Sequence, residues 1–141
     1  VNTASMAGLM ALPGAGPYNA TKHAVVAISE GLFLELGGLG SPVGVSVLCP
    51  GFVKTDLMSM EHVDSPSATT PPTGQMASLM GLLIADGVET GVAANDVAQA
   101  VVDAVDGGRF WILTHEDMRQ IPVERMQRAA AQINPSSTGD D

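Results

Sequence analysis

The chain has 141 residues, of which 45% are hydrophobic, and its 15 acidic and 6 basic side chains give a formal charge of −9. This apolar content is enough for the core of one domain and excludes a disordered chain, while the negative charge argues against a nucleic-acid or anionic-membrane partner. The longest apolar run, residues 76–85, is too short to span a bilayer, and the single Cys49 excludes an internal disulfide and fits the reducing cytoplasm.

The first predicted elements are a strand, a loop and a helix. Residues 1–4 suit the end of a strand, which would leave the hydroxyl of Ser5 at the edge of a sheet. Residues 5–17 contain too many glycines and prolines for regular structure, so they are predicted to form a loop. A helix is predicted over residues 18–36, because Pro17 suits a first turn and apolar residues then recur at helical spacing.

Three side chains near the start of the chain form a candidate proton-transfer site. Tyr18 and Lys22 are four residues apart, so a helix places both on the same face. A phenol, with a pKa of about 10, needs a fixed positive charge nearby to exchange protons at neutral pH, and the Lys22 ammonium can supply it. The Ser5 hydroxyl could bind the oxygen that Tyr18 protonates or deprotonates. Taken singly, such a pair is usually a solvated surface pair and such a serine a turn or cap residue.

The helix over residues 18–36 is apolar on more than one side. We expect one face to pack on the sheet and the other on a partner subunit, which would make the protein a homo-oligomer. A helix enclosed within one subunit explains the pattern equally well. The main stripe comprises Val25, Ile28, Leu32 and Leu36, and Val26, Phe33 and Leu34 widen it.

A second strand is predicted over residues 43–49, which are almost continuously apolar. A strand that is apolar on both faces belongs in the middle of a parallel sheet covered by helices. Its carboxyl end leads into Pro50, Gly51, Val53 and Thr55, and ligands bind at the carboxyl ends of the strands in open α/β sheets. A simple turn from strand to loop is the alternative.

The second half of the chain is predicted to contain a long mobile segment, further helices and a last strand. The segment covers about residues 52–94 and includes a helix over residues 73–85. Asn95 is predicted to cap a helix that reaches about residue 105. Residues 110–114 are predicted to form the last strand and residues 118–131 a terminal helix.

The remaining features near the C-terminus have structural interpretations. His115 is expected to be structural, because no Cys or carboxylate spacing around it forms a site, and no metal is predicted. Residues 135–141 are expected to form a frayed polar tail.

Taken together, the motifs resemble those of the short-chain dehydrogenase/reductase family. They are Ser5, the thirteen-residue step to Tyr18, the Tyr-x-x-x-Lys core and the Pro-Gly-x-Val-x-Thr run that starts at Pro50. The resemblance covers about the first 56 residues. It implies an α/β fold, the C-terminal half of a Rossmann-like doubly wound parallel sheet with three strands and flanking helices, as a single partial domain over residues 1–141. The glycine-rich N-terminal half is then expected to be missing, because the glycine-rich turn of the family has no counterpart here. Residues 14–19 mimic the start of a dinucleotide fingerprint but have Asn19 in place of its third glycine.

The resemblance also implies a function, that of an NAD- or NADP-dependent oxidoreductase that interconverts an alcohol and a carbonyl. Tyr18 would be the general acid or base, Ser5 would orient the substrate oxygen, and Lys22 would stabilise the phenolate and bind the nicotinamide ribose. The cofactor would also contact Pro50 and Gly51. The backbone of Val53 would hold the carboxamide, and the hydroxyl of Thr55 would reach the phosphate side.

The resemblance makes the mobile segment the region that binds substrate. Its methionines, at positions 58, 60, 76 and 80, would suit a hydrophobic substrate, although ordinary core packing explains them equally well. The isolated chain is expected to be inactive without the missing half. The alternative function is a catalytically inactive fragment that serves as an α/β dimerisation module through the helix over residues 18–36.

Overall fold

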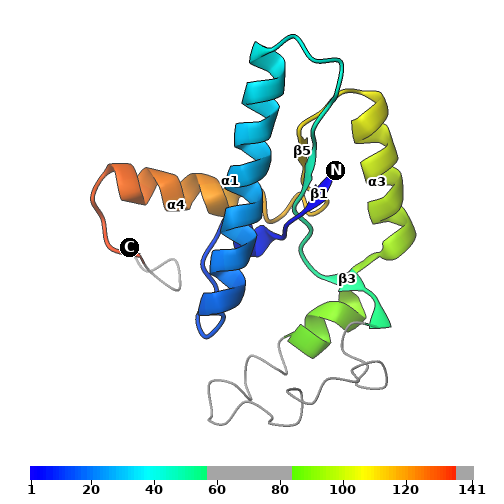
Figure 1. Ribbon diagram of the computed structural model, residues 1–141. Coiled ribbons are helices and arrows are strands. Elements are labelled where there is room, and N and C mark those ends of the chain that lie inside the picture. Colours follow the sequence, from blue (N-terminus) through cyan, green and yellow to red (C-terminus); the bar gives the residue numbers. More distant parts are fainter. Residues whose placement is uncertain (57–83, 136–141) are drawn as a thin grey trace, which may run out of the picture.

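The structure is a computed structural model that describes residues 1–56 and 84–135. Three short parallel strands form its central sheet in the order β1-β2-β5. Figure 1 labels β1 and β5 between the helices. The three strands are β1 (Asn2–Thr3), β2 (Val47–Leu48) and β5 (Trp111–Ile112). The three predicted strands are therefore confirmed.

A second parallel pair of strands was not predicted. It consists of β3 (Val53–Lys54) and β4 (Val92–Ala93), with Val53 opposite Val92. The segment predicted to be mobile over residues 52–94 contains regular elements at both ends: the β3–β4 pair occupies both, and residues 84–90 are helical. The middle of the segment and most of the helix predicted over residues 73–85 lie outside the described residues, as does the tail from residue 136.

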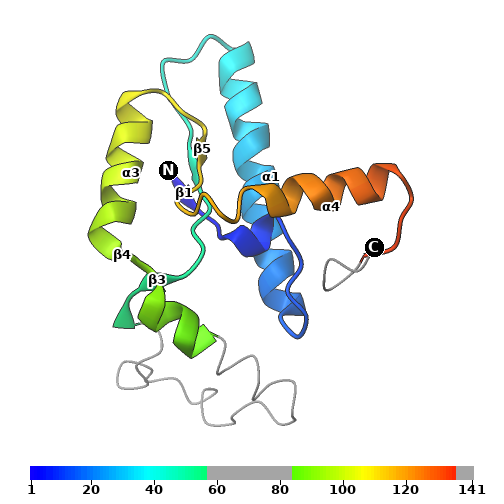
Figure 2. The same cartoon turned by 180° about the vertical axis from the view of Figure 1, so that it is seen from behind.

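Helices cover both faces of the central sheet. Figures 1 and 2 show α1 (Gly16–Gly38) on one face and α3 (Ala94–Asp106) on the other. The last helix, α4 (Gln120–Ala130), projects past α1 on the side away from α3. A single 3-10 turn, η1 (Met6–Gly8), follows β1. The α/β architecture with a parallel sheet between helices confirms the predicted fold class.

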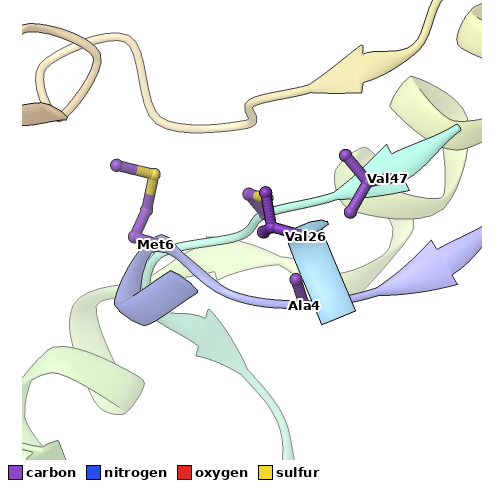
Figure 3. Packing of buried hydrophobic residues seen from close by; sticks show 5 residues of the cluster. Ala4, Met6, Val26 and Val47 are labelled. Carbon is purple, nitrogen blue, oxygen red and sulfur yellow. The ribbon is translucent and has the colours of Figure 1, made fainter. Parts of the chain in front are cut away.

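The core divides at β2 because successive side chains of a strand point to opposite faces. Val47 and Cys49 pack against α1, and Leu48 packs against α3. Figure 3 shows the α1 side, where Val26 of the helix lies near Val47 of β2, Ala4 after β1 and Met6 of η1. The buried members of that cluster are Ala4, Met6, Val26, Val47 and Cys49, and those on the α3 side are Leu48, Val97, Ala104 and Ile112.

The second strand is shorter than predicted. The N–H of Asn2 donates to Ser46 and the N–H of Cys49 to Ile112, both at 2.9 Å, so the ladder begins and ends near these positions. Val43 lies before the ladder and is 61% exposed. An apolar run indicates where a strand can form, but the strand extends only as far as a neighbour offers backbone partners.

The buried face of α1 also differs from the predicted stripe. Ile28, a member of the predicted apolar stripe, is 67% exposed, whereas Ser29 is fully buried. The Ser29 hydroxyl donates to the carbonyl of Val25 at 2.6 Å and accepts from the side-chain amide of Asn2 at 3.0 Å. A polar side chain can occupy this buried line because both of its hydrogen-bonding roles are satisfied.

The predicted starts of α3 and of the last helix, α4, are each wrong by two residues. Asn95 lies inside the first turn of α3, whose N-cap is Ala93 in an extended conformation, because β4 runs directly into the helix. α4 begins after Arg119 rather than at Met118. Within residues 1–56 and 84–135, no helix has the length and apolarity needed to cross a bilayer.

Gly8 brings η1 into direct contact with α1. A Cβ atom at Gly8 would lie 2.6 Å from the carbonyl oxygen of Lys22 and 2.9 Å from a methyl group of Val26. No side chain fits at the first of these distances without moving backbone, so a glycine at this position sets how closely the turn after Ser5 approaches the helix.

We predict that Gly8→Ala lowers the free energy of unfolding by about 1–3 kcal/mol, since η1 or α1 must shift to admit the methyl group. Gly31→Ala is the matched control, because a Cβ at Gly31 meets nothing within 4 Å. In mid-helix that change is expected to raise stability by about 0.5–1 kcal/mol. Urea denaturation followed by circular dichroism measures both, and equal effects of the two variants would contradict the close packing.

Candidate active site

Ser5 lies between the ends of two parallel strands. It caps η1, with its Oγ accepting the N–H of Ala7 at 3.2 Å, and its hydroxyl donates to the carbonyl of Pro50 at 3.4 Å. That carbonyl also accepts the N–H of Met6 at 2.9 Å. A hydroxyl bond of 3.4 Å is longer than the usual 2.5–3.0 Å, so it is weak, and the hydroxyl can turn to another oxygen at little cost.

Tyr18 and Lys22 lie on one face of the first turns of α1, as their spacing predicts. The Lys22 Nζ lies 5.6 Å from the centroid of the Tyr18 ring. It donates to the carbonyl of Thr3 at 3.3 Å, which ties the ammonium to the carboxyl end of β1. An ammonium has three N–H donors, and the bond to Thr3 uses one of them. Tyr18 is 48% exposed.

The structure therefore brings four predicted site residues to the same edge of the sheet. Ser5 and Pro50 are linked by a hydrogen bond, and Lys22 contacts both the Tyr18 ring and the residue that ends β1. This edge is the carboxyl end of the parallel strands, where open α/β sheets bind ligands.

The other predicted residues follow β2 into the second sheet. Gly51 donates its N–H to the Nδ1 of His115 at 3.1 Å, and the carbonyl of Phe52 accepts the N–H of Val92 at 3.0 Å. Val92 lies opposite Val53, and a parallel pair in this register bonds Val92 to residues 52 and 54. The N–H and C=O of Val53 therefore point toward the other edge of β3. Thr55 follows β3 and has an exposed side chain.

Sequence reasoning missed the contacts that hold the loop between Ser5 and Tyr18. Arg125 of α4 donates to the carbonyl of Leu9 at 3.1 Å, and its guanidinium lies 3.1 Å from the Nε2 of His23. The Nδ1 of His23 contacts the carbonyl of Asn19 at 2.8 Å. The side-chain amide of Asn19 donates to Leu12 in the same loop at 2.8 Å. No sequence pattern indicates contacts between residues that are more than one hundred positions apart.

Cys49 lies in the core directly before Pro50. Burial raises the pKa of its thiol from 9.0 to about 11, against smaller lowering effects of a backbone hydrogen bond from Ser5 and the charge of Lys22. The thiol is thus neutral near pH 7 and acts as a small apolar side chain. Among residues 1–56 and 84–135, no three His, Cys, Asp or Glu side chains are grouped to hold a metal ion.

Comparison with known proteins identifies the family. Residues 1–65 match the short chain dehydrogenase family. A solved short-chain dehydrogenase/reductase from Burkholderia phymatum, in complex with NAD, has a TM-score of 0.87 and 34% identity over 99% of this chain. The chain belongs to the short-chain dehydrogenase/reductase family. The match covers 50% of the Burkholderia chain.

Two curated relatives extend the comparison within the short-chain dehydrogenase/reductase family. A CLA biosynthesis dehydrogenase/reductase of Lactiplantibacillus plantarum is 35% identical over 91% of this chain and 46% of its own length. A 1-deoxy-11-beta-hydroxypentalenate dehydrogenase of Streptomyces exfoliatus is 34% identical over 84% of this chain and 36% of its own length. The chain thus spans less than half the length of these two relatives.

The raised pKa of Cys49 predicts a loss of stability at alkaline pH. In the unfolded chain the thiol loses its proton above about pH 9.0, whereas the folded protein keeps it neutral up to about pH 11. The unfolded state therefore gains stability between these values, and the free energy of unfolding should fall through this window.

Cys49→Ala is the matched control, because it lacks the thiol and keeps every other group of the protein. Urea midpoints measured at several pH values from 8 to 11 should converge for the two proteins as the pH rises. A constant difference across this range would show that the thiol titrates alike in both states.

Proposed function

We propose that the chain is the catalytic half of an NAD(P)-dependent oxidoreductase that interconverts an alcohol and a carbonyl. The proposal is carried by the Lys22 ammonium, which lies near the Tyr18 ring and bonds the end of β1 two residues before Ser5, in a family of oxidoreductases. When bound, the nicotinamide supplies or accepts the hydride. The protein supplies positioning and proton transfer.

In the reducing direction, Tyr18 protonates the carbonyl oxygen of the substrate. Ser5 turns its weakly held hydroxyl from Pro50 to the same oxygen and orients it. Lys22, close to the Tyr18 ring, stabilises the phenolate that remains. The oxidising direction uses the same groups, with the phenolate accepting the proton from the alcohol.

The residues present fit the nicotinamide end of the cofactor. Lys22 has N–H donors beyond the one that binds Thr3, which suit the hydroxyls of a ribose. The N–H and C=O of Val53 point away from β4 and match the acceptor and donor of a carboxamide. Pro50 and Gly51 form the turn that leads to Val53, and Thr55 is the further hydroxyl toward the phosphates.

The rest of the dinucleotide is assigned to a glycine-rich half that precedes this chain in the complete fold. Activity is therefore proposed for a polypeptide with both halves. NAD is the ligand of the Burkholderia phymatum structure. We propose NAD or NADP for this protein, since the residues that contact the 2′ position of the ribose, and so distinguish the two, belong to the other half.

The proposed substrate is a small-molecule alcohol or carbonyl, hydrophobic in character. One relative is named as a dehydrogenase of 1-deoxy-11-beta-hydroxypentalenate, which supports an alcohol as the substrate class. The methionines predicted to line the substrate region lie outside the described residues.

The helix α1 supports a homo-oligomer as a further proposal. Ile28 and Leu34 are each 67% exposed, and Phe33 is 41% exposed. Apolar side chains of this size suit burial against a second subunit. The comparisons do not favour a chain that serves only for dimerisation. A cytoplasmic location and the absence of nucleic-acid and membrane partners stay predictions from composition.

Tyr18→Phe is predicted to lower kcat by about 10²-fold or more in a polypeptide with both halves, because the ring stays and only the proton-bearing oxygen is lost. Cofactor affinity should change little. Turnover is followed by the absorbance of the reduced nicotinamide and affinity by calorimetry. A variant that retains most of its turnover would show that Tyr18 is not the acid or base.

Lys22→Met is predicted to lower both kcat and cofactor affinity, since the ammonium stabilises the phenolate and binds the ribose. Arg109→Met is the control, because it also removes one positive charge, but from an exposed residue at the other end of the strands. Its neighbour Phe110 accepts a backbone hydrogen bond from Val47 at the start of β2. If the two variants behave alike, the Tyr18–Lys22 contact is a surface pair without a catalytic role.

A further inference from the structure

His115 reaches back to the residues that follow β2. It lies just beyond β5, yet its Nδ1 accepts the N–H of Gly51 at 3.1 Å and its Nε2 lies 2.9 Å from the carbonyl oxygen of Phe52. Both nitrogens of the ring thus bind the backbone of one dipeptide, more than sixty residues earlier in the chain.

The partners of the ring identify its tautomer. A carbonyl oxygen only accepts hydrogen bonds, so the Nε2 must carry the proton that is donated to Phe52. The Nδ1 is then an acceptor for the N–H of Gly51 and for the hydroxyl of Thr114, which is 2.9 Å away. In this tautomer the ring presents an acceptor, Nδ1, to the N–H of Gly51 and a donor, the Nε2 N–H, to the carbonyl of Phe52.

Packing holds the same dipeptide from both sides. A Cβ at Gly51 would lie 2.7 Å from the sulfur of Met118 and 2.9 Å from the ring of His115. A Cβ at Gly87 would lie 2.6 Å from the ring of Phe52. The carbonyl of Phe52 also accepts the N–H of Val92, so both of its lone pairs are used.

We propose that His115 is a positioning residue for the cofactor. By binding Gly51 and Phe52, it fixes the peptide that precedes Val53 and so sets the direction of the N–H and C=O of Val53. This inference rests on the proposed function, in which those groups bind the carboxamide. An apolar side chain of similar size would fill the same space without fixing the rotation of the peptide.

The test uses a polypeptide with both halves and compares His115→Leu, His115→Asn and His115→Gln. Asn can keep the acceptor for Gly51 and Gln the donor to Phe52, whereas Leu keeps neither. Thr114→Val is the control, because it removes the other hydrogen bond to Nδ1 and leaves both backbone bonds in place. Calorimetry with NADH and NADPH gives the affinity, and steady-state kinetics gives kcat and both KM values.

His115→Leu is expected to weaken cofactor binding about tenfold, as the loss of two hydrogen bonds implies. His115→Asn and His115→Gln should each retain part of the affinity that His115→Leu loses, and Thr114→Val should leave the affinity unchanged. The KM for the cofactor should rise more than kcat falls, with the KM for the alcohol or carbonyl unchanged. A purely structural role would lower the melting temperature without this separation.

Two results would overturn the inference separately from the proposed function. The first is unchanged cofactor affinity in His115→Leu when the unmodified protein binds a dinucleotide. The second is a ¹⁵N NMR spectrum that shows the proton of His115 on Nδ1. If the unmodified protein binds neither NADH nor NADPH, the proposed function fails, and the positioning role fails with it.

Discussion

The pairing of β2 with a parallel strand on each side is the constraint on which the rest of the structure depends. The N–H of Ala4 donates to Leu48 at 2.8 Å, and the N–H of Cys49 donates to Ile112 at 2.9 Å. Both faces of β2 are buried, one by α1 and one by α3. A shift of one residue would exchange the side chains of the two faces, so the register of this strand is strongly determined.

The proposed site follows from where β2 ends. Pro50 comes directly after the last ladder bond, and its carbonyl joins Ser5 and Met6 to the second strand. The next peptide is bound by His115, which follows β5. The three strands therefore contribute one site element each: the serine, the turn to Val53 and the histidine. α1 adds Tyr18 and Lys22. The close approach of Gly8 to α1 packs the turn that follows Ser5 against this helix.

The predictions from sequence succeeded where the signal is local and dense. The apolar run around Val47, the helical spacing of Tyr18 and Lys22, and the step from strand to Ser5 each depend on neighbours within a few residues. The errors came from long-range partners. Val43 has strand-like character but lies before the ladder. Asn95 was expected to cap α3, but the helix starts earlier because β4 runs directly into it.

The sequence by itself determined the fold class, the order of the strands along the chain and the identity of the candidate acid, base and charge partner. The apolar runs mark the strands, whereas the fold class and the candidate site follow from the resemblance of the motifs to those of the short-chain dehydrogenase/reductase family. Only the tertiary structure decided that Ser29 is buried while Ile28 is exposed, and that His115 binds Gly51. These depend on which backbone groups and side chains meet across the fold, and partners as distant as Asn2 and Ser29, or Gly51 and His115, leave no local pattern in the chain.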